Sequence, residues 1–199
     1  LPAGGKFTTK QREIYDIVLA ANVRGQELAR PGVTYQSVHI EAMKVIASGL
    51  TALGLMRGDP AEAVAAGAAA LFMPHGLGHQ MGLDVHDMEG LGEKYVGYDD
   101  ATTRSTQFGL SALRMGKTLK AGHVLTVEPG IYFIPALIEK WEREQIHTAF
   151  INFPKLHTYF DFGGIRLEDD ILVTPTGNRL IGKHRVPIIP SDVENAMTR

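Results

Sequence analysis

Residues 124–133, VLTVEPGIYF, read as two short β-strands separated by a turn. β-Branched and aromatic residues favour extended backbone, and the Pro129-Gly130 dipeptide is typical of turns. Glu128 ends the first strand on the same face as Val124 and Thr126, because side chains alternate along a strand. A buried carboxylate at this position requires a cationic partner. The alternative is an exposed glutamate at the strand end, beside the turn.

A second strand-like segment runs from Ile165 to Thr174 and ends at the turn-forming residues 175–177. Period-two alternation places Arg166, Glu168 and Asp170 on one face and aliphatic residues on the other. Neighbouring acids in an otherwise apolar strand reduce stability unless they are paired or bind a metal. The alternative is an edge strand that its charges keep from aggregating.

The first third of the chain has helical periodicity. Thr8 and Gln11 fit a capping box, and apolar residues then recur at helical spacing until Pro31-Gly32. A second periodic pattern covers residues 38–53. Two helices are therefore expected before residue 55.

Asp59-Pro60 places a capping residue before a proline suited to the first helical turn, which predicts an alanine-rich helix to about Leu71. Helices gathered before strands predict an α+β fold rather than alternating βαβ units. Residues 90–107 and 135–162 are polar or irregular and read as insertions into this core.

Residues 74–87, PHGLGHQMGLDVHD, contain His75, His79 and His86 separated by glycines. This composition is poorly suited to a core, because glycine contributes no packing and each buried imidazole needs a polar partner. Glycine does allow the backbone to approach a ligand or metal closely. Taken alone, the stretch is equally compatible with a solvated loop whose histidines have no common role.

The composition excludes several classes of site and partner. Without cysteine the chain has no disulfide, thiolate metal site or cysteine nucleophile, so a metal must be held by His, Asp or Glu. Such ligands favour hard divalent ions. A formal net charge of −2 gives no reason to expect nucleic acid or an anionic membrane as a partner. The longest apolar run, Ala63 to Met73, is too short to span a bilayer.

At these motifs the chain resembles the pita-bread metallopeptidases, which include methionine aminopeptidase, aminopeptidase P and Xaa-Pro dipeptidase (prolidase). The similarity to prolidase is closest, and it extends with gaps from the first residues to about Asn195. The nearly unbroken matches are residues 5–8, 72–79, 84–87, 125–133 and 163–170. The resemblance implies an α+β pita-bread fold, here incomplete, with helices packed on a curved, mainly antiparallel sheet.

The resemblance also implies a dinuclear metal site. In that family two Asp, one His and two Glu hold two divalent ions, expected to be Mn²⁺ with Zn²⁺ or Co²⁺ as alternatives. Here the matching ligands are His79, Glu128 and Glu168, with Glu168 bridging the two ions. The ions are expected to polarise the scissile carbonyl and activate a water, whose proton Glu128 takes.

Four further residues match functional positions of the family. His75 and His86 match histidines that line the substrate pocket and steady the tetrahedral intermediate. Arg166 matches an arginine beside the bridging glutamate, which it is expected to orient. Arg114 matches the prolidase arginine that grips the free carboxylate of a C-terminal proline, a clamp that excludes longer peptides.

The two aspartate ligands of the family, a further pocket histidine and the N-terminal domain precede the segment equivalent to Leu1-Pro2-Ala3. We therefore expect residues 1–199 to be the C-terminal part of the catalytic domain: a fragment, a nicked product or one half of a split protein. Its expected partners are the N-terminal segment of the same protein and a second copy in a homodimer. The chain alone is expected to be inactive.

The leading hypothesis for function is metal-dependent hydrolysis of Xaa-Pro dipeptides or short peptides by a cytoplasmic protein. Aminopeptidase P activity on longer peptides is the first alternative, and Arg114 together with the 135–162 insertion favours the dipeptidase. A non-catalytic pita-bread module for protein binding is the second. Such modules usually lose metal ligands, whereas every ligand expected in this stretch is present.

Overall fold

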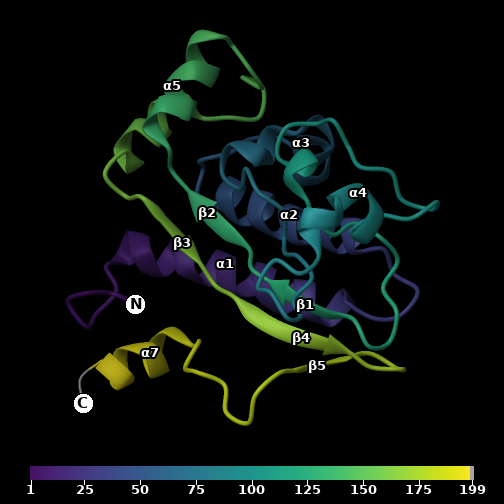
Figure 1. Ribbon diagram of the computed structural model, residues 1–199. Coiled ribbons are helices and arrows are strands. Elements are labelled where there is room, and N and C mark those ends of the chain that lie inside the picture. Colours follow the sequence, from purple (N-terminus) through teal and green to yellow (C-terminus); the bar gives the residue numbers. More distant parts are fainter. Residues whose placement is uncertain (198–199) are drawn as a thin grey trace.

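Two long helices form one layer of the structure, a computed structural model that describes residues 1–197 (Figure 1). α1 (Thr9–Leu28) packs along α2 (Tyr35–Ala52). The predicted capping box is present: Gln11 N–H donates to Thr8 Oγ1, and Thr8 N–H donates to Gln11 Oε1 at 2.9 Å. No helix within the described residues is long and apolar enough to cross a membrane.

The other helices are short. They are α3 (Pro60–Ala66), α4 (Glu93–Val96), α5 (Pro135–Arg143), α6 (Phe153–Leu156) and α7 (Pro190–Met197), with 3₁₀ turns η1 (Ala68–Leu71), η2 (Glu89–Leu91), η3 (Leu110–Ala112) and η4 (His157–Tyr159). Asp59 caps α3 as predicted, but the helix does not continue to Leu71. Gly67 has a φ of 90°, a left-handed conformation that ends α3 and opens the 3₁₀ turn.

The strands form two small antiparallel sheets. β1 (Val124–Val127), β4 (Asp169–Val173) and β5 (Asn178–Leu180) pair in the order β1-β4-β5, and β2 (Gly130–Tyr132) pairs with β3 (Gly164–Arg166). The single strand predicted over residues 165–174 is therefore divided into β3 and β4. The division lies beside Pro129, which has no N–H to donate and only accepts a hydrogen bond from Leu167 N–H at 3.2 Å.

The register is continuous across this division. The flanking cross-strand pairs are Val127 with Asp169, and Gly130 with Arg166. The same register places Glu128 directly opposite Glu168. Cβ atoms of opposed residues in antiparallel strands lie about 4.5–5.5 Å apart, and like charges there are destabilising. The fold thus brings two carboxylates together where the paired strands are interrupted.

Buried polar side chains of the two long helices hold the backbone of β1. Tyr35 Oη donates to the Thr126 carbonyl at 2.6 Å, and Asn22 Nδ2 donates to the Val127 carbonyl at 2.9 Å. The surrounding core draws on both helices and strands, including Ile14, Val18, Ile46, Leu50, Phe72, Leu125 and Ile131. These contacts fix the strand that ends at Glu128 against the helix layer.

Residues 135–162, predicted as an insertion, pack onto the core. α5, α6 and η4 carry the buried side chains Ile138, Trp141, Phe153, Leu156 and Tyr159. The Tyr159 ring stacks on Phe133, just beyond β2, with centroids 4.6 Å apart. Tyr159 of η4 therefore covers the end of β2.

We expect Tyr35→Phe to lower the free energy of unfolding by about 1–3 kcal/mol, because a buried carbonyl loses its partner. Tyr95→Phe is the matched control, since Tyr95 lies on α4 with 72% of its surface exposed. Its effect should stay within about 0.5 kcal/mol. Urea denaturation of both variants measures the difference, and equal stabilities would contradict the role assigned to Tyr35.

Candidate active site

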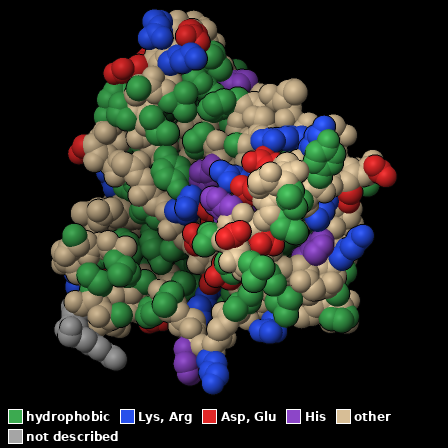
Figure 2. Space-filling view, in the orientation of Figure 1, with side chains coloured by type: hydrophobic (Ala, Val, Ile, Leu, Met, Phe, Trp, Pro, Cys, Tyr) green, Lys and Arg blue, Asp and Glu red, His purple; other side chains and the backbone are tan. Residues whose placement is uncertain are grey.

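The residues proposed from the sequence meet in one pocket of about 420 Å³. Its wall includes His75, His79, His86, Arg114, Glu128, Arg166 and Glu168. They come from the 74–87 loop, the segment after η3, the end of β1 and the β3–β4 junction. Histidine, acidic and basic side chains lie beside one another on this face of the molecule (Figure 2).

Glu128 is the buried charge of this pocket, with only 7% of its surface exposed. Its Oε1 lies 3.2 Å from His79 Nε2 and accepts from Thr126 Oγ1 at 3.2 Å, and its Oε2 lies 3.1 Å from Arg166 Nη1. Burial raises the pKa of Glu128, but the hydrogen bond from His79 and the charge of Arg166 outweigh it and hold the pKa below its ordinary value. The alternative of an exposed strand-end glutamate is therefore wrong, and the cationic partners required for burial are present.

Each ring nitrogen of His79 lies beside a hydrogen-bond acceptor. Nδ1 lies 2.9 Å from the Gln80 carbonyl, which can only accept, so this nitrogen carries a proton. Nε2 faces Glu128. Burial lowers the pKa of His79, but the bonds to Glu128 and to Gln80 outweigh it and raise the pKa. A metal ion therefore has to displace the Nε2 proton, after which the Gln80 carbonyl holds the ring in the tautomer suited to coordination.

Arg166 stands between the two opposed glutamates. Its Nη1 lies 3.1 Å from Glu128 and its Nη2 lies 3.9 Å from Glu168. The stronger contact is thus with Glu128, whereas the resemblance implied that Arg166 orients Glu168. Burial, followed by the charge of Glu128, raises the pKa of Glu168. A second cation near Glu168 would relieve this repulsion.

The donor set suits a divalent cation in its chemistry. One imidazole and two carboxylates face a common space, and burial together with the charge of Glu128 raises the pKa of Glu168. Among residues 1–197, however, no three His, Asp or Glu side chains are already arranged to hold an ion. His79 and Arg166 occupy the Glu128 oxygens instead. The residues therefore fit a metal by type and position, and binding requires local rearrangement.

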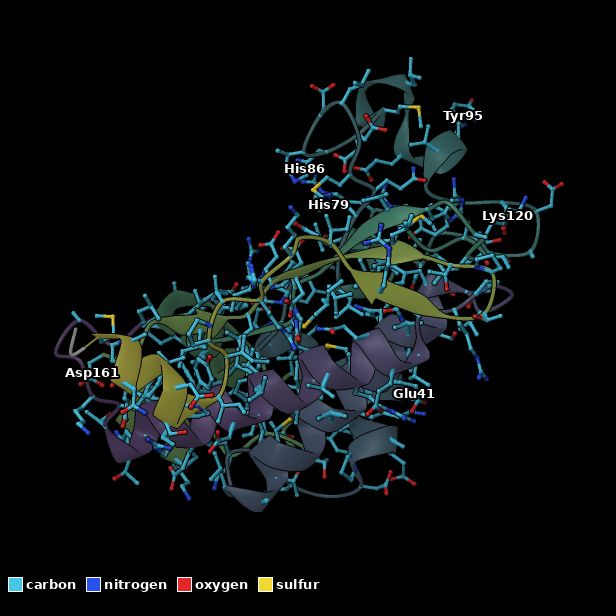
Figure 3. The ribbon with its side chains drawn as sticks, turned by 90° about the horizontal axis from the view of Figure 1, so that it is seen from below. Glu41, His79, His86, Tyr95, Lys120 and Asp161 are labelled. Carbon is cyan, nitrogen blue, oxygen red and sulfur yellow. The ribbon has the colours of Figure 1, made fainter. Side chains whose placement is uncertain are left out.

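His75 and His86 have opposite hydrogen-bonding roles. His75 Nδ1 lies 2.7 Å from the Gly76 carbonyl and must donate. In the neutral ring Nε2 is therefore an acceptor, and this buried atom has no hydrogen-bond partner among the described residues. Arg114 donates to His86 Nδ1 at 3.2 Å, so the proton of neutral His86 lies on Nε2. His86 packs edge-on against His79, with centroids 4.2 Å apart (Figure 3). His86 can therefore donate to a bound peptide, whereas the acceptor Nε2 of His75 is buried in the pocket wall.

Arg114 reaches the pocket but is not free. Its Nη1 pairs with Glu89, at the start of η2. Glu89 was not predicted from the sequence, because nothing in a single sequence links positions 25 residues apart in irregular segments. The carboxylate clamp expected of Arg114 thus already holds a carboxylate of the protein.

His39 on α2, also not predicted from the sequence, binds the backbone of the 74–87 loop. Its buried Nδ1 accepts from Leu77 N–H at 3.1 Å, and burial lowers the pKa of His39 to about 4. The Leu77 carbonyl in turn accepts from Glu128 N–H at 2.7 Å. In the sequence, His39 lies at an apolar position of a helix, and this pattern predicts only a core residue.

Gly78 permits the close approach of this loop to β1. A Cβ at this position would lie 2.0 Å from the Thr126 carbonyl oxygen and 2.7 Å from Thr126 Oγ1. The same hydroxyl accepts from His79 N–H at 3.0 Å, and Thr126 N–H donates to the His79 carbonyl at 3.1 Å. The glycine thus sets His79 beside Glu128.

Comparison with known proteins shows which families and proteins this chain is similar to. The model of metallopeptidase family M24 matches residues 2–175. A probable Xaa-Pro aminopeptidase of Podospora anserina is 40% identical over 178 residues, which cover 89% of this chain and 37% of the relative. The Xaa-Pro dipeptidase of Rattus norvegicus is 39% identical over 180 residues, or 90% of this chain and 35% of the relative. The chain spans little more than a third of these relatives.

The fold is shared with solved structures of aminopeptidase P. Zinc-substituted Escherichia coli aminopeptidase P in complex with product superposes with a TM-score of 0.67 and 35% identity, covering 98% of this chain and 36% of that one. This similarity confirms the predicted α+β pita-bread fold and its incompleteness in these 199 residues.

We expect Gly78→Ala to lower the free energy of unfolding by about 1–3 kcal/mol, because the new methyl group forces the loop away from β1. Gly177→Ala is the matched control, since a Cβ there meets nothing within 4 Å. Denaturation curves of the two variants provide the test. An unperturbed Gly78→Ala protein would mean that the loop does not sit against Thr126 as described.

Proposed function

The chain belongs to metallopeptidase family M24, and we propose that the protein containing it hydrolyses the peptide bond before proline, with Xaa-Pro dipeptides as its substrates. The observation that carries this proposal is the convergence of His79, Glu128 and Glu168 in a pocket that also presents Arg114. Relatives named both Xaa-Pro aminopeptidase and Xaa-Pro dipeptidase support the preference for a bond next to proline.

We propose that His79, Glu128 and Glu168 are ligands of two divalent metal ions, with Mn²⁺ as the physiological metal. Bound metal ions supply the Lewis acidity that activates a water for attack. No aspartate of the described residues lines the pocket. The two aspartate ligands that the resemblance implies are therefore proposed to come from a further segment of the protein, without which this chain is inactive.

The other functions proposed for the pocket residues are proton transfer and contact with the substrate. Glu128 accepts the proton of the attacking water, and Arg166 and Thr126 hold its carboxylate in place. His86, which carries its proton on Nε2, donates to oxygen that becomes negative as the carbonyl is attacked. His75 is proposed to line the substrate pocket beside the bound peptide, with its Nδ1 held by the Gly76 carbonyl.

Arg114 is proposed to bind the C-terminal carboxylate of the dipeptide. Aminopeptidase activity on longer peptides is a second candidate, and one observation favours it. Because Arg114 is paired with Glu89, the guanidinium offers less net charge to a free carboxylate than an unpaired arginine would. The two candidates differ in whether the substrate ends at the proline.

We expect Arg114→Ala to reduce kcat/KM for an Xaa-Pro dipeptide roughly ten- to a hundredfold, the value of a charge-assisted hydrogen bond of about 1.5–3 kcal/mol. Turnover of the C-terminal amide of the same dipeptide should change much less. Arg104→Ala is the matched control, because Arg104 pairs with Glu93 and does not line the pocket. Equal losses on the dipeptide and the amide would assign Arg114 a structural role and favour the aminopeptidase candidate.

A further inference from the structure

Glu89 introduces a carboxylate at the Arg114 end of the pocket. Its Oε2 pairs with Arg114 Nη1 and lies 4.0 Å from His86 Nδ1, and only 17% of the side chain is exposed. Met88, just before it, has a φ of 58°, a left-handed conformation that is uncommon outside glycine. The backbone thus adopts a strained turn where Glu89 is directed at Arg114.

Only one of the two Glu89 carboxylate oxygens, Oε2, has a hydrogen-bond partner within the described residues. Its Oε1 is buried and has no hydrogen-bond partner within the described residues. A structural ion pair of this depth normally satisfies both oxygens, because an unpaired buried oxygen is costly. What distinguishes Glu89 is its position, because it contacts Arg114 and lies 4.0 Å from His86, two residues of the pocket wall.

We propose that Glu89 determines substrate preference by neutralising Arg114. The inference rests on the proposed function, since it takes Arg114 as the contact for the C-terminal end of the substrate. A free carboxylate that approaches the guanidinium meets the like charge of Glu89, whereas the neutral carbonyl of an amide or of a longer peptide does not. Glu89 thus reduces the advantage of dipeptides over extended or amidated substrates.

The guanidinium geometry allows both groups to be present at once. Within residues 1–197, Arg114 uses Nη1 for Glu89 and for His86, and the N–H groups of Nη2 and Nε make no side-chain hydrogen bond. Glu89 can therefore stay in place while a substrate binds. The carboxylate of Glu89 then still repels the carboxylate of a bound dipeptide, and this repulsion raises KM for the dipeptide.

The test compares Glu89→Gln with the parent protein, using the active protein that contains residues 1–199. The variant keeps the size and hydrogen bonding of the side chain and removes its charge. We expect KM for an Xaa-Pro dipeptide to fall about three- to tenfold, as for partly exposed charges a few ångströms apart. KM for the dipeptide amide should stay within about twofold, and the inhibition constant of L-proline should fall while that of prolinamide does not.

Matched variants isolate the charge. Glu93→Gln removes a carboxylate from the same segment, paired at 2.7 Å with Arg104 outside the pocket wall, and should change neither substrate. Glu89→Asp keeps the charge and should retain the parent preference. Glu89→Ala removes the charge with a different side chain and should reproduce Glu89→Gln, which guards against a folding defect in one variant.

The outcomes separate this inference from the proposed function. A higher KM for the dipeptide in Glu89→Gln would show that Glu89 only supports Arg114, and an equal change for dipeptide and amide would show a general effect on the site. Either result overturns the role of Glu89 while a selective loss in Arg114→Ala leaves the proposed function intact. If Arg114→Ala is itself unselective, the proposed carboxylate contact is wrong and the inference falls with it.

Discussion

The opposition of Glu128 and Glu168 across adjacent strands is the constraint on which the rest of the site depends. The register that pairs β1 with β4 and β2 with β3 places the two carboxylates opposite each other, and one of them is buried. Such an arrangement is unstable without positive charge. Arg166 and His79 lie against Glu128, whereas burial and the charge of Glu128 raise the pKa of Glu168. A divalent cation bound between them would supply positive charge to both glutamates at once.

The surrounding structure holds this unfavourable pair in position. Tyr35 and Asn22 bind the backbone of β1 just before Glu128, and His39 binds the loop that carries His79. The 74–87 loop and the end of β1 are also bonded to each other, because the Leu77 carbonyl accepts from Glu128 N–H. Buried helix side chains therefore position both the imidazole and the carboxylate through their backbones. The site is built on packed elements, which is what precise placement of ligands requires.

Much of this site could be predicted from the sequence because its chemistry is local. A glutamate after β-branched residues and adjacent acids in an apolar strand reduce stability unless they are paired or bind a metal, which made Glu128 and Glu168 candidates. The resemblance to the pita-bread metallopeptidases then assigned them as metal ligands. Their direct opposition could not be predicted, because register depends on pairing between segments 40 residues apart. The same limit applies to the Arg114–Glu89 pair, and to Arg166, which lies closer to Glu128 than to Glu168. The end of α3 at Gly67 was missed because a glycine within an alanine-rich run is compatible with either a helix or a cap.

The central claim is that the opposed glutamates and His79 form a metal site once a cation replaces the proton on His79. The most direct measurement is a crystal structure of the active protein with Mn²⁺, with the metal located by anomalous scattering. We predict a peak contacted by His79 Nε2 and by oxygens of Glu128 and Glu168, with the His79 Nδ1 bond to the Gln80 carbonyl retained. A protein that leaves His79 Nε2 on Glu128 at saturating Mn²⁺, or that binds the ion elsewhere, would contradict the account.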